Sequence, residues 1–508
     1  MNTRTSRLME WLVMAVLLVW LAWHLAVPVD FIRSDLGRHI ANGRLILQGQ
    51  WDVLYENFYT YTCPHYPFIN HHWLFGVFCY VLWHHFGFFG LCLVYLVLEL
   101  LTFVLFFRAA RRHASLLLVS GVALLSFPLV SFRPEVRPEG ISYFCCGLFW
   151  WMLEAHRQGR MNPRLLAAVL CLVQAFWVNM HIFFILGPFL TALFAAQACL
   201  NGEKDRFKFL VKFSFLLLAA CLINPSGPKA YLALGYAASV KNYFILETQS
   251  LSFLLQAAYL PWRSFAVYVL SAIGLLGIGL LLALWRGGIR KNAAVSLLAL
   301  ILSLWVINSL RMIGLLSFFW ILLTAYVYGG WLKAKPWPFR KTVEVILLVT
   351  GIAVSAFVNV DWKRAPWIGL TPGINRPAEF FKEHKISGPI FNNFDDGSYL
   401  IFHLYPQEKE FIDNRLEAFP REFFTKTYIP MQLDRAIWQK MEHQYHFNAI
   451  FFSLDTTPWG IKFMRDRFAD LQWATVYNTD KAIIWLKRNA RNAGIIKHNE
   501  IKVLYVQF

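Results

Sequence analysis

The sequence has few charged residues for its length and lacks the short motifs of several enzyme classes. Asp, Glu, Lys and Arg make up 15% of its 508 residues. It contains no G-x-G-x-x-G, no P-loop and no Ser-His-Asp spacing, which argues against nucleotide-binding enzymes and serine hydrolases. It also contains no block of like charges, so nothing predicts a tail that binds nucleic acid or another polyanion.

Cysteine is scarce and unevenly placed. All eight cysteines lie between Cys63 and Cys221, and residues 360–508 have none. A disulfide framework therefore cannot hold the C-terminal part of the chain. No C-x-x-C pair occurs, which argues against thiolate zinc sites and dithiol redox chemistry.

Apolar residues dominate the first 359 residues. The whole chain is 57% hydrophobic with a mean hydropathy of +0.46, which is more apolar surface than a soluble domain can bury. A membrane-spanning helix needs roughly 20 apolar residues. On this basis we predict eleven transmembrane helices, at about 10–29, 88–107, 114–132, 140–156, 165–180, 182–200, 209–224, 265–285, 293–308, 312–330 and 342–359. The first run has no small-x-small cleavage site, so we expect it to be retained as a span.

Basic residues alternate between the connections and predict an orientation. Cytoplasmic loops are rich in Lys and Arg. Every second connection is basic, beginning with the N-terminus: Arg4/Arg7, Arg108/Arg111/Arg112, Arg157/Arg160/Arg164, Lys204/Arg206/Lys208, Arg286/Arg290/Lys291 and Lys333/Lys335/Arg340/Lys341. The N-terminus is then cytoplasmic and the C-terminal part lies outside. This count requires residues 71–85, which are short and bounded by His pairs, to form an interfacial helix rather than a span.

Residues 360–508 differ from the membrane part, because charged residues recur every few positions. PAEFFKEHK and GSYLIFHLYP predict helices, whereas GPIFNN, EFIDNR, NAIFFSL and AIIWLK predict strands. The predicted fold is therefore a polytopic α-helical membrane protein, with a membrane module over 1–359 that includes an outer first loop at 30–72. An α/β domain over 360–508, on the outer side, follows it.

Polar residues gather in the connections that this orientation puts outside. Such groups are costly in a membrane protein and are usually kept for function. The outer connections carry Asp35, Arg38, His39, His71, His72, Arg133, Glu135, Arg137, Glu139, Asn179, His181 and Arg311. Glu99 lies within the predicted span 88–107 and has no functional interpretation.

Several of these segments resemble one enzyme family. The stretch SDLGRHIANGRLILQG…NFYTYTCPHYPFINHHWL (34–74) resembles the first outer loop of bacterial GT-C membrane glycosyltransferases. FRPEVRPEG, WVNMH, INPSG, the SLR turn and the later GPIFNNFDDGSYL…EFIDNR (388–415) follow in the order expected for that group. The sequence departs from the oligosaccharyltransferase branch, because no C-terminal motif resembles the one that recognises an acceptor asparagine.

The resemblance implies an inverting glycosyltransferase of the mannosyltransferase or aminoarabinose-transferase type. The donor would be a sugar on a polyprenyl phosphate, and the acceptor a glycan, a lipid or a protein. Asp35 would be the catalytic residue. Transfer from a phosphate leaving group needs one base for the acceptor hydroxyl and cations for the departing phosphate. Arg133, Arg137 and Arg311 are candidates to bind that phosphate, because guanidinium groups bind phosphate in a bidentate manner.

Each residue also has a structural interpretation. Asp35 could pair with Arg38 at i+3 of a helix, and Glu135 and Glu139 could neutralise Arg133 and Arg137. His39, His71 and His72, with Asp35, could bind a divalent cation, or the histidines could bond backbone and headgroups. Asn179 and His181 could line a cavity or cap a helix. Asp413 and Arg415, at the end of a predicted strand, could contact the acceptor or form an ion pair within the domain.

Two other functions fit a membrane protein of this kind. One is a transporter or flippase of lipid-linked sugars, although transporters tend to carry charged groups and broken helices near the midplane. The other is a non-catalytic assembly protein for envelope polysaccharides, which would not need Asp35.

Overall fold

The computed structural model describes residues 3–232, 235, 245–285, 292–334, 339–358, 365–454 and 457–501. The chain divides into two compact units. Unit 1 comprises residues 1–27, 92–227 and 244–368, and unit 2 comprises residues 28–91, 228–243 and 369–508. The domain division predicted from the sequence placed loop 30–72 in the membrane module, whereas in the structure this loop belongs to unit 2.

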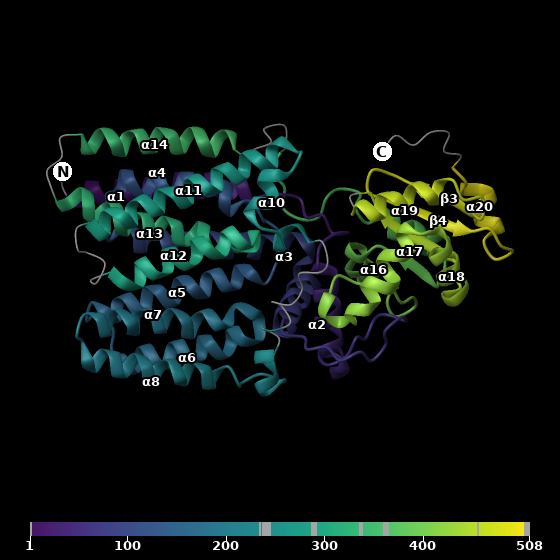
Figure 1. The fold of residues 1–508 in the computed structure, drawn as a ribbon, viewed down its shortest axis with the longest axis horizontal. Coiled ribbons are helices and arrows are strands. Elements are labelled where there is room, and N and C mark those ends of the chain that lie inside the picture. The colour runs from purple at the N-terminus through teal and green to yellow at the C-terminus, as the bar shows by residue number, and fades with distance from the viewer. Residues whose placement is uncertain are drawn as a thin grey trace. The chain divides into compact units, whose positions relative to one another are not determined.

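Unit 1 is helical, and its long helices run side by side (Figure 1). Its elements are α1 (Thr3–Leu25), α4 (Leu116–Val130), α5 (Glu139–Arg157), α6 (Pro163–Met180), η2 (Ile182–Ile185), α7 (Leu186–Leu200), α8 (Lys204–Ala220), η4 (Leu246–Thr248), α10 (Leu251–Gln256), α11 (Leu260–Trp285), α12 (Ala293–Asn308), η6 (Leu310–Met312), α13 (Ile313–Ala334) and α14 (Arg340–Phe357). The second part of α3 (Trp73–Arg111) also belongs to it. Local signals set several starts: the Ser115 hydroxyl accepts from Leu118 N ahead of α4, and Asn162 followed by Pro163 opens α6.

Helices cover all eleven predicted spans. Among the residues that the structure describes, six helices are long and apolar enough to cross a membrane: Arg7–Leu25, Trp73–Arg111, Pro163–Met180, Ile182–Leu200, Leu260–Trp285 and Leu310–Gly330. Leu116–Val130 and Ala293–Asn308 are apolar but shorter. The chain is thus a multi-pass membrane protein, and the count of eleven stays a prediction. Of the basic connections, Arg286, Arg290, Lys291 and Lys335 lie outside the described residues.

Close helix contacts in unit 1 depend on small residues. A Cβ atom on Gly351 of α14 would lie 2.6 Å from the Gly121 carbonyl oxygen of α4, and one on Gly121 would lie 2.9 Å from the Leu347 carbonyl carbon. Small residues let helices approach closely where no hydrophobic effect drives their association within a bilayer. The Trp20 indole also donates to Ser355 Oγ at 3.0 Å, which joins α1 to α14.

The predicted interfacial segment 71–85 forms the first part of α3, which begins at Trp73. Helical geometry is interrupted at Gly87, where φ is 64° and ψ is −170°. This backbone conformation is essentially confined to glycine. The segment is therefore a helix in its own right, separated from the following span by Gly87.

In unit 2 the first loop packs against the C-terminal part of the chain. It contains α2 (Leu36–Leu47) and η1 (Trp51–Leu54), and α2 lies beside α16 (Gly397–Leu404). The Arg38 backbone N–H donates to Ser398 Oγ at 2.9 Å, and Thr60 forms a parallel bridge with Glu410. An apolar cluster fills the interface: Ala41, Leu45, Ile46, Val53, Leu54, Tyr59 and Ile401.

The C-terminal part of unit 2 holds a four-stranded mixed sheet in the order β1-β2-β4-β3. Its strands are β1 (Ile390–Asn392), β2 (Ala449–Ser453), β3 (Trp473–Asn478) and β4 (Ala482–Lys487). β1 pairs in parallel with β2, with Ile390 opposite Ala449, and the other pairs are antiparallel. The helical elements around it are α15 (Arg376–Glu383), η7 (Phe394–Asp396), α16, η8 (Leu416–Ala418), η9 (Phe423–Tyr428), α17 (Ile429–Leu433), α18 (Arg435–Tyr445), α19 (Pro458–Phe468) and α20 (Ala493–Asn499), and η3 (Gly227–Lys229) lies where the two units meet in sequence.

The predictions for this part were right for 390–392, 449–453 and 482–487 and for helices α15 and α16. They missed β3. The strand predicted for EFIDNR (410–415) was wrong, because the β-pairing of this segment is limited to a single bridge between Glu410 and Thr60. Its backbone groups bond elsewhere: Phe411 N donates to Asn392 Oδ1 at 2.9 Å, and Asn392 Nδ2 donates to the Ile412 carbonyl at 2.7 Å. Side chains thus replace a sheet partner for this extended segment.

Candidate functional site

Asp35 lies immediately before α2 in unit 2. Its carboxylate oxygen Oδ1 is 3.3 Å from Arg38 Nη2, and its side chain is 29% exposed while that of Arg38 is 6% exposed. Arg38 also donates through Nε to Asn414 Oδ1 at 3.4 Å. The i+3 ion pair that the sequence left open as the structural alternative is therefore present. The carboxylate stays accessible enough to meet a further group.

His39, His71 and His72 form an aromatic group beside α2. The His71 and His72 ring centroids are 3.9 Å apart, and the His39 ring meets His72 edge-on at 5.7 Å. His71 Nδ1 lies 3.2 Å from the Ile69 carbonyl oxygen. Among the described residues, no group of three or more His, Cys, Asp or Glu side chains could hold a metal ion. The cation site considered from the sequence is therefore not assembled by these residues.

Asp413 and Arg415 form an ion pair buried inside unit 2. Arg415 donates through Nε to Asp413 Oδ1 at 2.8 Å and through Nη2 to Asp413 Oδ2, and the two side chains are 1% and 0% exposed. Arg415 Nη2 also donates to Asn57 Oδ1 at 2.9 Å. Through the bond from Arg415 to Asn57, the pair connects the first loop to the C-terminal part of unit 2. This geometry matches the ion pair within the domain that the sequence left open.

In unit 1, the candidate arginines meet in one ionic cluster. We name it the Glu247 cluster, and it comprises Arg133, Glu135, Arg137, Glu139, Glu247 and Arg311. Prolines shape the connection between α4 and α5 that carries its first members, with Pro138 directly before α5. Glu139 occupies the first turn of α5, where a helix favours negative charge. The cluster's last members lie on η4 and η6, and Leu310 N of η6 donates to the carbonyl of Gln249, the residue directly after η4, at 2.9 Å.

Glu247 is the centre of this cluster. Its Oε2 lies 2.5 Å from Arg133 Nη2 and 3.2 Å from Arg137 Nη1, and its Oε1 accepts from Arg311 Nη2 at 2.9 Å. Glu139 Oε1 is 3.3 Å from Arg133 Nη1 and 3.7 Å from Arg311 Nε. Three guanidinium groups and three carboxylates therefore share one site, with Glu135 Oε2 at 3.6 Å from Arg137 Nε.

The arginines control the ionisation of Glu247. Burial opposes its charged form, but the three neighbouring guanidinium groups outweigh burial and lower the pKa of Glu247 to about 2. The side chain is 16% exposed. Sequence reasoning missed this residue, because it belongs to no motif and its partners come from distant segments. Its position as an isolated acid in a connection that the charge pattern predicts to be outside was the only available signal.

Asn179 and His181 lie at the end of α6 and are both buried. Asn179 Nδ2 donates to the carbonyls of Ala175 at 2.7 Å and Ile223 at 2.8 Å, so it binds the ends of two helices. His181 Nδ1 is 2.7 Å from Ser142 Oγ on α5. Both side chains therefore join helices, in agreement with the capping interpretation.

Glu99 of α3 lies next to the segment that carries Arg137 and Glu139. It is hydrogen-bonded to Tyr95, and the Tyr95 hydroxyl donates to the Arg137 carbonyl at 2.8 Å. A Cβ atom on Gly140 would lie 2.4 Å from Glu99 Oε1. This buried acid thus packs directly against the start of α5.

No protein-family model matches the sequence, and no curated protein matches it. The structure is similar to that of AglB, an archaeal oligosaccharyltransferase from Archaeoglobus fulgidus, solved in complex with an inhibitory peptide and a dolichol-phosphate. The two are 9% identical with a TM-score of 0.56, over 96% of this chain and 75% of that one. An Archaeoglobus fulgidus oligosaccharyltransferase tethered to an acceptor peptide is 9% identical with a TM-score of 0.55, over 94% of this chain and 74% of that one. ArnT from Cupriavidus metallidurans is 13% identical with a TM-score of 0.49, over 94% of this chain and 98% of that one.

The likeness extends over nearly the whole chain and includes both compact units. It agrees with the family resemblance found in the first loop. The chain therefore has the fold of the GT-C membrane glycosyltransferases.

Proposed function

We propose that the protein is an inverting glycosyltransferase that transfers a sugar from a polyprenyl-phosphate donor to an acceptor at the outer face of a bacterial inner membrane. The observation that carries this proposal is the GT-C fold over 96% of the chain. The neighbour of that fold was solved with a dolichol-phosphate, a lipid phosphate of the same chemical class as the proposed donor carrier. The predicted orientation, with a cytoplasmic N-terminus and residues 360–508 in the periplasm, belongs to the proposal.

Asp35 is the proposed base. It takes the proton of the acceptor hydroxyl while that oxygen attacks the anomeric carbon from the face opposite the phosphate. The bond between the anomeric carbon and the phosphate oxygen breaks, and polyprenyl phosphate leaves with the bonding electrons. A glycosidase would instead need two carboxylates in opposed roles. The partial exposure of Asp35 beside Arg38 is compatible with this task.

The cations of the Glu247 cluster are the proposed binders of the donor phosphate. Arg133, Arg137 and Arg311 offer guanidinium groups, which bind phosphate oxygens with two parallel hydrogen bonds. Arg311 is the most exposed of the three, at 37%. In this proposal, phosphate oxygens take over contacts that Glu247 makes with Arg311.

The test is transfer of labelled sugar by purified protein in liposomes that contain a polyprenyl-phosphate sugar and an extract of envelope acceptors. Asp35→Asn should reduce the rate by about 10²–10⁴-fold, the usual contribution of a general base. It should barely change stability, because a partly exposed helical ion pair contributes about 0.3–0.5 kcal/mol. Asp30→Asn is the matched control, since Asp30 is an exposed acid of the same loop and is expected to keep full activity.

Three outcomes distinguish the functions. Loss of transfer by Asp35→Asn, with normal folding and an active Asp30→Asn, supports the enzyme. Movement of intact lipid-linked sugar across vesicles, with no sugar consumed, would instead support a transporter or flippase. An assembly protein would tolerate Asp35→Asn and lose its role when residues 369–508 are deleted.

A further inference from the structure

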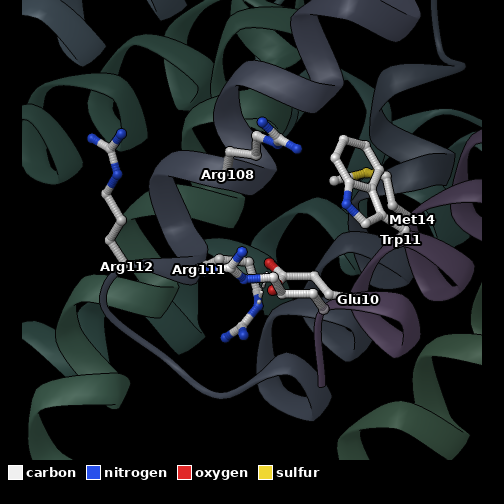
Figure 2. Close-up of a pocket in the computed structure, with 7 residues that line it drawn as sticks. Glu10, Trp11, Met14, Arg108, Arg111 and Arg112 are labelled. Atoms are coloured by element: carbon white, nitrogen blue, oxygen red, sulfur yellow. Dashed lines mark ion pairs between the residues drawn. The ribbon is translucent and has the colours of Figure 1, made fainter. Parts of the chain in front are cut away.

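A basic pocket lies in unit 1, away from the Glu247 cluster, where the start of α1 meets the end of α3. Its volume is about 410 Å³. Figure 2 shows Glu10 and Arg111 together near its middle, with Arg108 above them and the Trp11 ring to one side. Arg7 and Arg112 complete the polar lining, and Met14 contributes an apolar wall.

The pocket carries an excess of positive charge. Four arginines line it against one glutamate, so its net charge is +3. Glu10 Oε1 pairs with Arg111 Nε at 3.4 Å, and Arg111 Nη1 also donates to the Ala114 carbonyl at 2.5 Å. Arg111 is thus engaged in holding the fold together. The cluster as a whole is suited to bind an anion.

Two of the arginines lie against aromatic rings. The Arg108 guanidinium lies 4.5 Å from the Trp11 ring centroid, and that of Arg112 lies 5.7 Å from the Trp151 ring. Both arginines are exposed. Contact with an aromatic face restrains the guanidinium but leaves its N–H donors free to point toward an anion. Because phosphate matches the paired N–H groups of guanidinium, phosphate is the anion that this arrangement favours.

The pocket also lies at a membrane–water boundary. The apolar span Arg7–Leu25 begins here, and the span Trp73–Arg111 ends here. Trp11 is 59% exposed, as is typical of indoles at the level of lipid headgroups. A stripe of exposed apolar side chains on α1 continues from the pocket along the span, with Leu8 at 64%, Leu12 at 58% and Val16 at 61%. A lipid bound by its phosphate would find apolar surface for its acyl chains beside the pocket.

We infer that this pocket binds the headgroup phosphate of an anionic phospholipid. On the predicted orientation it faces the cytoplasmic leaflet, where basic pockets between membrane helices recognise such headgroups. The inference does not depend on the proposed sugar transfer, because it concerns neither Asp35 nor the Glu247 cluster. A soluble phosphate would use the same arginines but not the apolar stripe.

The test is native mass spectrometry of the purified full-length protein, titrated with dioleoylphosphatidylglycerol or dioleoylphosphatidylcholine. These lipids share acyl chains and differ in headgroup charge. The variant is Arg108→Gln/Arg112→Gln, which spares Arg111 and its bonds to Glu10 and Ala114. We expect the apparent affinity for the anionic lipid to fall on the order of 30-fold, about fivefold for each arginine near a membrane surface. Binding of the phosphatidylcholine should not change, which also verifies that the variant is folded.

The matched control is Arg164→Gln/Lys208→Gln. It removes the same charge from exposed positions in other basic connections of unit 1. An equal loss of anionic-lipid binding in the control would overturn the proposal, since general surface charge would then explain it. Equal binding of the two lipids by the unmodified protein would also overturn it. Displacement of the bound lipid by a large excess of inorganic phosphate would assign the pocket to a soluble anion instead.

Discussion

Glu247→Gln is expected to destabilise unit 1 strongly. Within the part of the chain that the structure describes, Glu247 is the one acid in contact with all three arginines of its cluster, at 2.5 Å to Arg133, 3.2 Å to Arg137 and 2.9 Å to Arg311. Glutamine keeps the size of the side chain and removes its charge. The variant therefore leaves three guanidinium groups with two carboxylates in a largely buried site.

The size of the effect follows from the pKa of Glu247. Folding lowers it from the ordinary value of 4.5 to about 2. At about 1.4 kcal/mol per pKa unit, the charged form contributes roughly 3 kcal/mol to stability. Arg311 is 37% exposed, so solvent screens its attraction to Glu247 and reduces the stabilisation below this figure. Breaking a fully buried pair from one side costs about 3–5 kcal/mol, so the expected loss for this partly exposed cluster lies near the lower end of that range.

The same pKa gives a pH dependence with a definite sign. A carboxyl group whose pKa is depressed by folding stabilises the folded state above its unfolded pKa of 4.5. That contribution is lost as the pH falls from 4.5 toward about 2. Unfolding free energies from SDS titration in mixed micelles should therefore differ between wild type and Glu247→Gln at pH 7, and converge as the pH is lowered through this window.

Glu135→Gln is the control for this prediction. Glu135 belongs to the same cluster, but its side chain is 36% exposed and lies 3.6 Å from Arg137. Its loss should cost under about 1 kcal/mol, as exposed ion pairs do. The reasoning is refuted if Glu247→Gln is no less stable than Glu135→Gln at pH 7.

Three further predictions concern other buried groups. Asp413→Asn should destabilise unit 2 by about 3–5 kcal/mol, because Arg415 is left charged and buried; limited proteolysis of the full-length protein measures this. Burial raises the pKa of Asp396 from 3.8 to about 8, so its contribution to stability is present below pH 3.8 and lost as the pH rises toward 8. Asp396→Asn should then stabilise unit 2 at pH 7 by up to about 4 kcal/mol, seen as slower hydrogen exchange in β2. Gly351→Leu should lower thermal stability, because its Cβ would lie 2.6 Å from the Gly121 carbonyl oxygen.

Matched variants separate these effects from general ones. Asp466→Asn breaks an exposed pair with Lys462, 2.8 Å long, and should cost under about 1 kcal/mol. Asp480→Asn changes an exposed acid beside Lys481 and should not alter the pH dependence near neutrality. Gly274→Leu places a side chain in open space on α11 and should be tolerated. Equal effects in a variant and its control would contradict the corresponding prediction.

The sequence by itself determined the helical membrane part and much of the C-terminal domain. Apolar runs of about 20 residues have few alternatives to a helix in a bilayer, where every backbone group must be bonded within the segment. This is why helices cover every predicted span. Strong β-type runs at 390–392, 449–453 and 482–487 were likewise recognisable from their own residues.

Tertiary structure decided which polar residues meet. Glu247 has no local signal, and only tertiary packing brings it to Arg311 on η6 and to Arg133 and Arg137 in the connection between α4 and α5. Segment 410–415 has a strand-like sequence, yet Asn392 and Thr60 satisfy its backbone, so no strand forms. Loop 30–72 packs against the C-terminal part through α2 and Asn57 rather than remaining with the helices beside it in sequence. Such contacts depend on which distant groups can satisfy a buried charge or carbonyl, and local sequence patterns carry no information about that choice.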